Sequence, residues 1–185
     1  MHTSSEKTRY LLDKNVIRRA IVARRNGRLR SLTPEELGVL AFWRAIEQDQ
    51  GTLLISSAAF HLLEHLSPSV EVQVVLDSMG VLWPTQYHKR WARRIRDTTG
   101  LTSEDSAQIA LASFGADTEM AFLGAHYLVT LDQALMAGYR GHLPALNRRL
   151  QAMIVQLESP YDRAVLPRIV APTEFLAGRR RLLLS

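Results

Sequence analysis

Short apolar runs alternate with helix-forming segments along this chain, and this alternation constrains its fold more than any other feature. Five runs, at residues 9–13, 52–56, 81–83, 126–130 and 168–170, are too short for core helices and indicate strands. The segments between them carry apolar residues at the three-and-four spacing of amphipathic helices. This order predicts an α/β fold, a three-layer α/β/α sandwich with a mainly parallel sheet of about five strands.

Capping residues mark where helices begin. In Thr33-Pro34-Glu35-Glu36 the threonine suits the N-cap, the proline suits the first helical position, and Glu36 suits the capping box, so a helix is expected over 34–49. Further helix starts are expected at 67–69 and 102–105. Pro144 is expected to open an extra helix, over about 144–157, before the last strand. Because no linker rich in Gly or Ser divides the chain, we expect a single domain over residues 1–185.

Composition excludes some chemistry and some locations. The chain of 185 residues is 46% hydrophobic and 22% charged, which is ordinary for a globular domain. It has no cysteine, so disulfides and thiolate metal sites are excluded. No apolar run approaches the roughly 20 residues of a membrane span. Because residues 1–7 are polar, the expected location is the cytoplasm.

Two segments carry basic residues almost without acids. Residues 14–30 hold seven basic residues and no acid, and a second run over 88–96 surrounds Trp91. A solvated helix face would normally mix charges of both signs, so these segments indicate a surface for a polyanion. Charge alone does not separate a nucleic acid from an acidic protein.

Acidic residues recur where parallel strands end or helices begin. Asp13, Asp105 and Asp132 lie at such positions, and a fourth acid, Glu64, lies on the helix that follows the second strand. Since ligands of open α/β sheets bind at the carboxyl ends of the strands, these acids are candidates for one site. Each also has a plainer interpretation: Asp105 as a helix cap, Glu64 as a solvated residue on a helix edge, and Asp132 as the start of a turn.

Five short motifs resemble those of PIN-domain ribonucleases, a family that includes the toxins of many bacterial toxin–antitoxin pairs. The motifs are YLLDKNV (10–16), SSAAFHLLEHL (56–66), GLTSEDSAQIALAS (100–113), YLVTLD (127–132) and IVAPTEFL (169–176). The first and fourth are the most specific, and the second, which carries Glu64, is the loosest. The resemblance covers nearly the whole chain and implies a PIN-like fold.

The chain departs from the family pattern in three places. Ser106 stands where the family commonly has Ala directly after the third acid. The stretch from Asp105 to Asp132 is long and carries Asp117 and Glu119, which are alternative ligands. The expected helix over 144–157 is an addition to compact members of the family.

The resemblance implies a metal-dependent endoribonuclease, the toxin component of a toxin–antitoxin pair. Asp13, Glu64, Asp105 and Asp132 would be both the catalytic and the metal-binding acids. Carboxylates that converge raise one another's pKa unless a cation lies among them, and oxygen ligands favour Mg²⁺ or Mn²⁺. Such a cation polarises a phosphate and lowers the pKa of a bound water.

Supporting roles follow from the same resemblance. Residues that would orient the acids or the water are Asn15, Ser56 (or Ser57) and Thr130. Residues expected to hold the RNA backbone are Arg18, Arg19, Lys89, Arg90 and Arg93. Trp91 is a candidate for stacking on an unpaired base, with burial in the core as the alternative. The implied partners are RNA, a cognate antitoxin protein and a second copy of the chain in a homodimer, without a membrane.

Other functions fit fewer residues. A haloacid-dehalogenase-type phosphatase needs an acid at position 15, where this chain has Asn15, and a Gly-Asp pair where it has Leu131-Asp132. A response-regulator receiver needs a Lys after the fifth strand, where this chain has Ala171-Pro172. The remaining alternative is a catalytically silent PIN-like module that binds RNA or protein. The presence of all four acids favours the enzyme.

Overall fold

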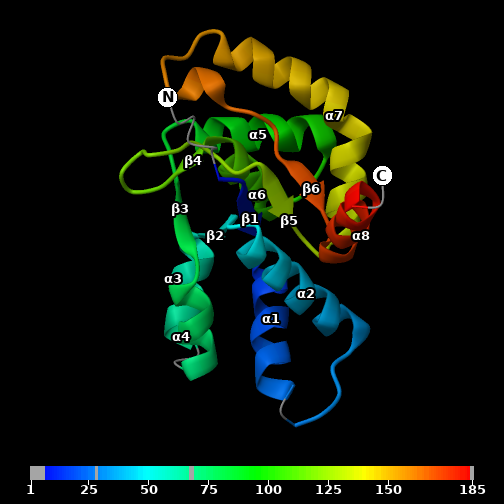
Figure 1. Cartoon of the computed structure of the whole chain (residues 1–185). Coiled ribbons are helices and arrows are strands. Elements are labelled where there is room, and N and C mark those ends of the chain that lie inside the picture. The colour runs from blue at the N-terminus through cyan, green and yellow to red at the C-terminus, as the bar shows by residue number, and fades with distance from the viewer. Residues whose placement is uncertain (1–6, 28, 67–68, 184–185) are drawn as a thin grey trace, which may run out of the picture.

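The computed structural model describes residues 7–27, 29–66 and 69–183 and shows an α/β fold (Figure 1). In these ranges, eight α-helices accompany a six-stranded sheet of order β4-β3-β2-β1-β5-β6. The strands are β1 (Arg9–Leu12), β2 (Thr52–Ser56), β3 (Gly80–Pro84), β4 (Gly115–Ala116), β5 (Tyr127–Val129) and β6 (Arg168–Val170). The helices are α1 (Lys14–Asn26), α2 (Pro34–Gln48), α3 (Ser57–Leu66), α4 (Val70–Asp77), α5 (His88–Thr99), α6 (Ser103–Phe114), α7 (Gln133–Ile154) and α8 (Pro172–Leu183).

The sheet is mixed. β1 pairs in parallel with β2 and β5, and the β2–β3 and β5–β6 pairs are also parallel, whereas β4 runs antiparallel to β3. The expectation of a mainly parallel sheet of about five strands is therefore corrected, although the α/β class is confirmed. The missed strand, β4, has only two residues and no apolar run. A Cβ on Gly115 would lie 2.6 Å from both Leu111 O and Leu82 Cγ, so this turn needs a glycine.

Both faces of the sheet are buried, because alternate strand residues enter two separate cores. Leu11 and Leu128 contact the cluster formed with α5, α6 and α7, whereas Leu12 and Val129 contact the cluster formed with α1, α2 and α4. Figure 1 shows α5 and α7 on one side of the sheet and α1 and α2 on the other. Each fully buried side chain of this size contributes roughly 1.5–3 kcal/mol. Because both faces are covered, the last three residues of β1, Tyr10 to Leu12, are all hydrophobic and buried.

The helix over 144–157 was expected to begin at Pro144, and this expectation is wrong. Pro144 lies inside α7, which begins at Gln133 directly after its N-cap Asp132. A proline in a helix interior costs about 3 kcal/mol. The helix continues through it because Leu135 and Met136 on one side of the proline, and Leu150 on the other, are buried in the same core.

The start of α2 matches the expected capping box. The Thr33 hydroxyl accepts a hydrogen bond from the N–H of Glu36 at 3.2 Å, and the N–H of Thr33 donates to Glu36 Oε2 at 2.8 Å. Pro34 occupies the first turn. These local contacts satisfy two backbone donors that would otherwise have no partner within the helix.

Replacing Thr33 with Ala is expected to lower the free energy of unfolding by about 1 kcal/mol. For a chain of this size the melting temperature should fall by roughly 2–4 °C. Thr33→Ser retains the hydroxyl and serves as the control in the same thermal unfolding measurement. Equal losses in both variants would contradict the capping contribution.

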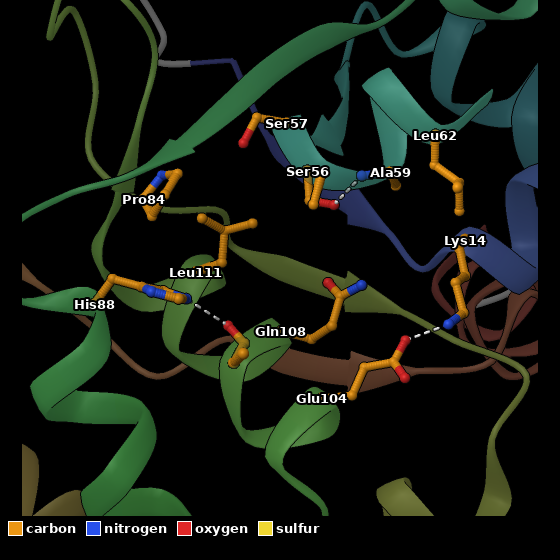
Figure 2. Close-up of a pocket in the computed structure, with 12 residues that line it drawn as sticks. Lys14, Ser56, Ser57, Ala59, Leu62, Pro84, His88, Glu104, Gln108 and Leu111 are labelled. Atoms are coloured by element: carbon orange, nitrogen blue, oxygen red, sulfur yellow. Dashed lines mark hydrogen bonds and ion pairs between the residues drawn. The ribbon is translucent and has the colours of Figure 1, made fainter. Parts of the chain in front are cut away.

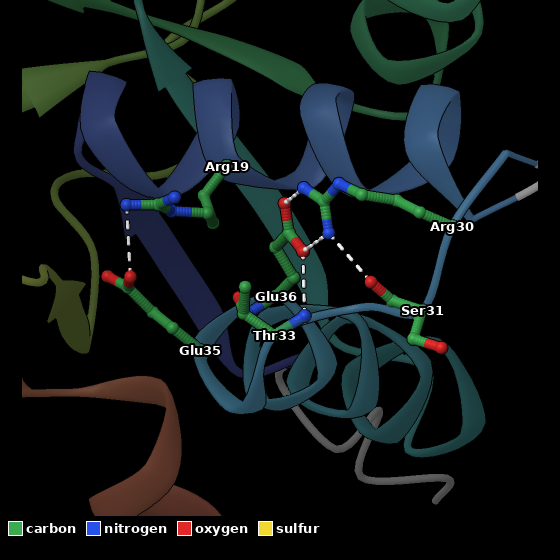
Figure 3. A network of polar contacts seen from close by, with 6 residues as sticks. All are labelled: Arg19, Arg30, Ser31, Thr33, Glu35 and Glu36. Carbon is green, nitrogen blue, oxygen red and sulfur yellow. Dashed lines mark hydrogen bonds and ion pairs between the residues drawn. The ribbon is translucent and has the colours of Figure 1, made fainter.

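An ion-pair network joins α1 to α2 (Figure 3). Arg30 donates to both oxygens of Glu36, at 3.0 and 2.8 Å, and the Glu36 side chain is buried. Hydrogen bonds from Arg30 and from the Thr33 backbone lower the pKa of Glu36 to about 2. Arg19 pairs with Glu35 of the same helix at 2.9 Å.

This network predicts a pH-dependent stability. Because the pKa of Glu36 is lower in the folded chain than its ordinary value, the carboxylate stabilises the fold above that ordinary value. The contribution is lost as the pH falls toward the folded pKa. At about pH 7, Glu36→Gln should therefore unfold at a lower urea concentration than the unsubstituted chain. The difference between the two urea midpoints should narrow by about pH 3. A gap that stays constant with pH would show that the carboxylate charge is irrelevant.

Candidate functional site

Three of the four predicted acids line one polar pocket at the carboxyl ends of β1 and β5. This pocket, called the acid pocket below, has a volume of about 130 Å³. Its acids are Asp13, Glu104, Asp105 and Asp132, and Asn15 and Thr130 also line it. Asp13 follows β1 and Asp132 follows β5, and these two strands are paired neighbours. The strand order therefore brings together residues that lie more than a hundred positions apart.

A buried threonine connects two of these acids. The Thr130 hydroxyl donates to Asp13 Oδ2 at 3.1 Å and accepts from the N–H of Asp132 at 3.0 Å. Thr130 is fully buried. Burial raises the pKa of Asp13, and hydrogen bonds from Thr130 and from the backbone of Asn15 oppose this rise. The charge of Asp13 is therefore costly to bury, and the hydrogen bond from Thr130 sets the orientation of its side chain.

Asp132 caps a helix, and Asp105 contacts the cap of another. Asp132 Oδ1 accepts from the N–H of Leu135 at 2.9 Å at the start of α7. Thr102 is the N-cap of α6: its hydroxyl accepts from the N–H of Asp105 at 3.1 Å and donates to Asp105 Oδ2 at 2.7 Å. The alternative interpretation of Asp105, a residue of the helix cap, thus holds together with its position in the acid pocket.

Glu64 and Ser56 do not line the acid pocket. Glu64 is exposed on α3, where an oxygen of its carboxylate lies 3.7 Å from His61 Nδ1. It follows the first residue of α3 by seven positions, which places it about 10 Å along the helix from the strand end. The Ser56 hydroxyl accepts from the N–H of Ala59 at 3.2 Å and caps the same helix.

The predicted RNA-binding residues divide into exposed and paired groups. Arg18 is exposed beside Asn15 and Asp132, in a depression of about 390 Å³. Lys89, Arg90 and Arg93 are exposed on α5. Arg19 lies in the same depression as Arg18 but already pairs with Glu35.

Other basic residues of 14–30 also have partners. Lys14 pairs with Glu104, Arg30 pairs with Glu36, and the Arg24 guanidinium lies over the Trp43 ring at 5.7 Å. The basic segment 14–30 contains no acid of its own, but acids of α2 and α6 partly neutralise its charge.

Trp91 does not stack on a base. Its side chain is fully buried, and its ring lies 6.4 Å from that of Phe114. The expectation of a stacking role is wrong, and the alternative of a core residue is confirmed. Asp117, a candidate substitute ligand, accepts from the N–H of Ala121 at 2.8 Å; neither it nor Glu119 lines the acid pocket.

The arrangement of the acids limits how they can bind a metal. Within the described ranges, no three His, Cys, Asp or Glu side chains lie close enough together to form a metal-holding group. The acids of the pocket are all oxygen donors, which suits Mg²⁺ or Mn²⁺. Mg²⁺ commonly keeps several waters and takes only one or two carboxylates directly. The oxygen donors of the pocket fit such an ion. One or two of the acids would bind it directly, and the others would hydrogen-bond to its waters.

Four further residues beside the acids are missing from the predicted site. Lys14, Glu104 and Gln108 line the acid pocket, and His88 lies in the adjoining one. Helical spacing could have identified two of them, since Glu104 and Gln108 are four residues apart on the face of α6 next to Asp105. His88 had no local signal, because only the packing of α5 on α6 brings it there.

No helix in the described part of the chain has the length and apolarity needed to cross a membrane. Comparisons with known proteins give no family to which the chain can be assigned. No family model matches it, and neither the curated proteins nor the solved structures give a significant match.

Proposed function

We propose that this protein is a metal-dependent endoribonuclease with a PIN-like three-layer fold. The observation that carries the proposal is the convergence of Asp13, Asp105 and Asp132 on one pocket at the carboxyl ends of β1 and β5. Burial makes the charged form of Asp13 costly in this pocket, and a cation bound beside it would stabilise that charge. The proposed reaction is hydrolysis of a phosphodiester bond in RNA.

The acid pocket would hold Mg²⁺ or Mn²⁺ through one or two of Asp13, Asp105 and Asp132, with waters of the ion between it and the remaining acid. Such an ion supplies a polarised phosphate and a water of lowered pKa. The chain's own residues prepare the site for it. The Thr130 hydroxyl fixes Asp13 Oδ2, and Asp13 is the acid assigned to accept a proton from an attacking water. Glu64 is assigned no role here because it is exposed on α3.

Charged residues at the rim would hold the RNA backbone. Arg18 lies beside Asp132, and Lys89 and Arg93 are exposed on α5. The Lys14 ammonium, which pairs with Glu104 in the acid pocket, is placed to meet a phosphate that enters it. Attraction of this kind is independent of base sequence and weakens with salt.

The biological setting is proposed from the motifs rather than from the pocket. We infer a cytoplasmic toxin that is restrained by a cognate antitoxin and that acts as a homodimer. The exposed cations of α5 are a surface that an acidic antitoxin segment would neutralise.

A silent RNA- or protein-binding module is the second candidate. The observation that favours it is that Asp105 and Asp132 each belong to a helix cap. Capping alone would keep these acids in place without chemistry. In that case the exposed basic residues would be the functional ones.

The deciding experiment is cleavage of single-stranded RNA with Mn²⁺, with Mg²⁺ and with EDTA. Cleavage that requires the metal and stops with EDTA would support the enzyme. RNA binding without cleavage when Mn²⁺ is supplied would support the silent module. Cleavage that is insensitive to chelator would contradict the metal-dependent mechanism.

A further inference from the structure

A second pocket adjoins the acid pocket and differs from it in chemistry. This apolar pocket has a volume of about 260 Å³ and lies between α3, α5 and α6 (Figure 2). Its apolar lining includes Ala59, Leu62, Pro84 and Leu111, and His88 lies at one side. Pockets of roughly 300–1,000 Å³ hold drug-sized ligands, so this one suits a single flat ring system.

Three residues line both pockets: Lys14, Glu104 and Gln108. Lys14 and Glu104 form an ion pair, which Figure 2 shows at one side of the apolar pocket. A ligand in the apolar pocket therefore lies next to any phosphate bound by the acid pocket. A nucleotide has this composition, a flat ring joined to a phosphate.

Gln108 brings to the apolar pocket a polar side chain whose hydrogen-bonding capacity is not fully satisfied. Its Oε1 is buried, and among the described residues it has no hydrogen-bond partner. Figure 2 shows the carboxamide directed from α6 into the pocket. A buried acceptor without a donor costs free energy, which a ligand that supplies the donor recovers. A carboxamide presents one donor and one acceptor side by side, which matches the edge of a base.

His88 is held so that its ring can pack against a base. Its Nε2 lies 3.0 Å from Ala107 O. Burial lowers the pKa of His88, so the ring is neutral near pH 7. The neutral imidazole offers an uncharged flat surface, the Pro84 ring adds an apolar one, and histidine is among the side chains on which unpaired bases stack.

We propose that the apolar pocket binds an unpaired adenine of the RNA, adjacent to the phosphate held by the acid pocket. Gln108 Nε2 donates to adenine N7, and Gln108 Oε1 accepts from the adenine N6 amine, the pairing that a glutamine makes most readily. The ring lies against His88 and Leu111. The assignment of this base as part of a substrate rests on the proposed function, and it gives that function a sequence preference.

The test measures binding without cleavage and compares bases only, because the contacts proposed for the base come from Gln108, His88 and Leu111 and not from the metal. Short oligouridine RNAs that carry one central adenine, cytosine, guanine or uridine are titrated against the full chain in EDTA by fluorescence anisotropy. The adenine oligonucleotide is expected to bind at least about five-fold more tightly than the others. Equal affinity for all four, or a preference for another base, would overturn the proposal.

Variants separate the carboxamide from the general surface. Gln108→Ala should lower the affinity for the adenine oligonucleotide to that for the uridine oligonucleotide. The control is Gln151→Ala, at an exposed glutamine of α7, which should leave the preference for adenine unchanged. If Gln108→Ala does not fold, Leu62→Trp carries the test. Leu62 is 40% exposed, so a larger ring there should fill the pocket without disturbing the core. Retention of the adenine preference in the folded variants would overturn the proposal.

The two proposals can fail separately. Metal-dependent cleavage without a base preference would support the endoribonuclease proposal and overturn the proposal that the apolar pocket binds adenine. An adenine preference that depends on Gln108, without cleavage under any metal, would leave the pocket in place and favour the RNA-binding module.

Discussion

Replacing Asp13 with Asn is expected to lower the rate of RNA cleavage by about 100-fold or more, the effect typical of a group that transfers the reacting proton. Asn retains the size of the side chain and an oxygen that accepts from the Thr130 hydroxyl. The variant therefore removes the charge while keeping the hydrogen bond. Gel-based cleavage assays with Mn²⁺ measure the rate.

The same variant should be more stable than the unsubstituted chain in EDTA. Burial raises the pKa of Asp13, so the folded chain binds this proton more tightly than the unfolded chain does. The folded chain consequently loses stability as the pH rises from the ordinary carboxyl pKa through the raised pKa of Asp13. Asp13→Asn has no proton to lose at this position and should not show that loss. The difference in melting temperature should disappear at low pH, where Asp13 is protonated in both states.

Asp162→Asn is the matched control, because Asp162 is exposed and lies outside the acid pocket. It should change neither the cleavage rate nor the melting temperature in EDTA. Full cleavage by Asp13→Asn would show that the acid pocket is not the catalytic site. A lower melting temperature in EDTA would show that the Asp13 charge stabilises the fold rather than opposing it.

Mn²⁺ is expected to raise the melting temperature of the unsubstituted chain in a concentration-dependent way, and Asp132→Asn is expected to lose this effect. A ligand that binds only the folded state contributes about 2.7 kcal/mol at 100 times its Kd. At roughly 2–4 °C per kcal/mol, the shift is about 5–10 °C. Asn is also a good N-cap, so the start of α7 should survive the change.

Glu64→Gln is the informative comparison in this titration. The motif resemblance places Glu64 among the metal ligands, whereas the structure places it on the exposed side of α3. The variant should therefore retain the full Mn²⁺ shift. Loss of the shift in Glu64→Gln, but not in Asp132→Asn, would move the metal site to α3 and contradict the acid pocket.

Local features of the fold could be predicted from the sequence because their contacts are local. The helix start at Thr33 depends on residues within three positions, and so does the start of α6 at Thr102. β1 and β2 each contain three consecutive hydrophobic residues, 10–12 and 53–55, because both faces of the sheet are covered. Asp13, Asp105 and Asp132 lie in sequence at the ends of predicted strands or the starts of predicted helices. Their convergence at the carboxyl edge of the sheet could therefore be expected.

Pairing between distant segments determined the rest. The basic residues Lys14 and Arg30 have partners in Glu104 and Glu36, so a segment that contains no acid is nevertheless partly neutral. Trp91 lies among charged neighbours in sequence, yet its face of α5 packs on α6 and is fully buried. The buried face consists of Trp91 and Ile95, four residues apart, with arginines between them in sequence.

The sequence by itself therefore determined the α/β class, the helix caps and the three acids that follow strands or open a helix, since each depends on residues close together in the chain. The tertiary structure alone decided that β4 runs antiparallel, that α7 continues through Pro144, that Glu64 lies outside the acid pocket and that Gln108 enters an apolar one. These outcomes depend on which buried surfaces meet. That choice is made by packing across long sequence separations, where local propensity contributes little.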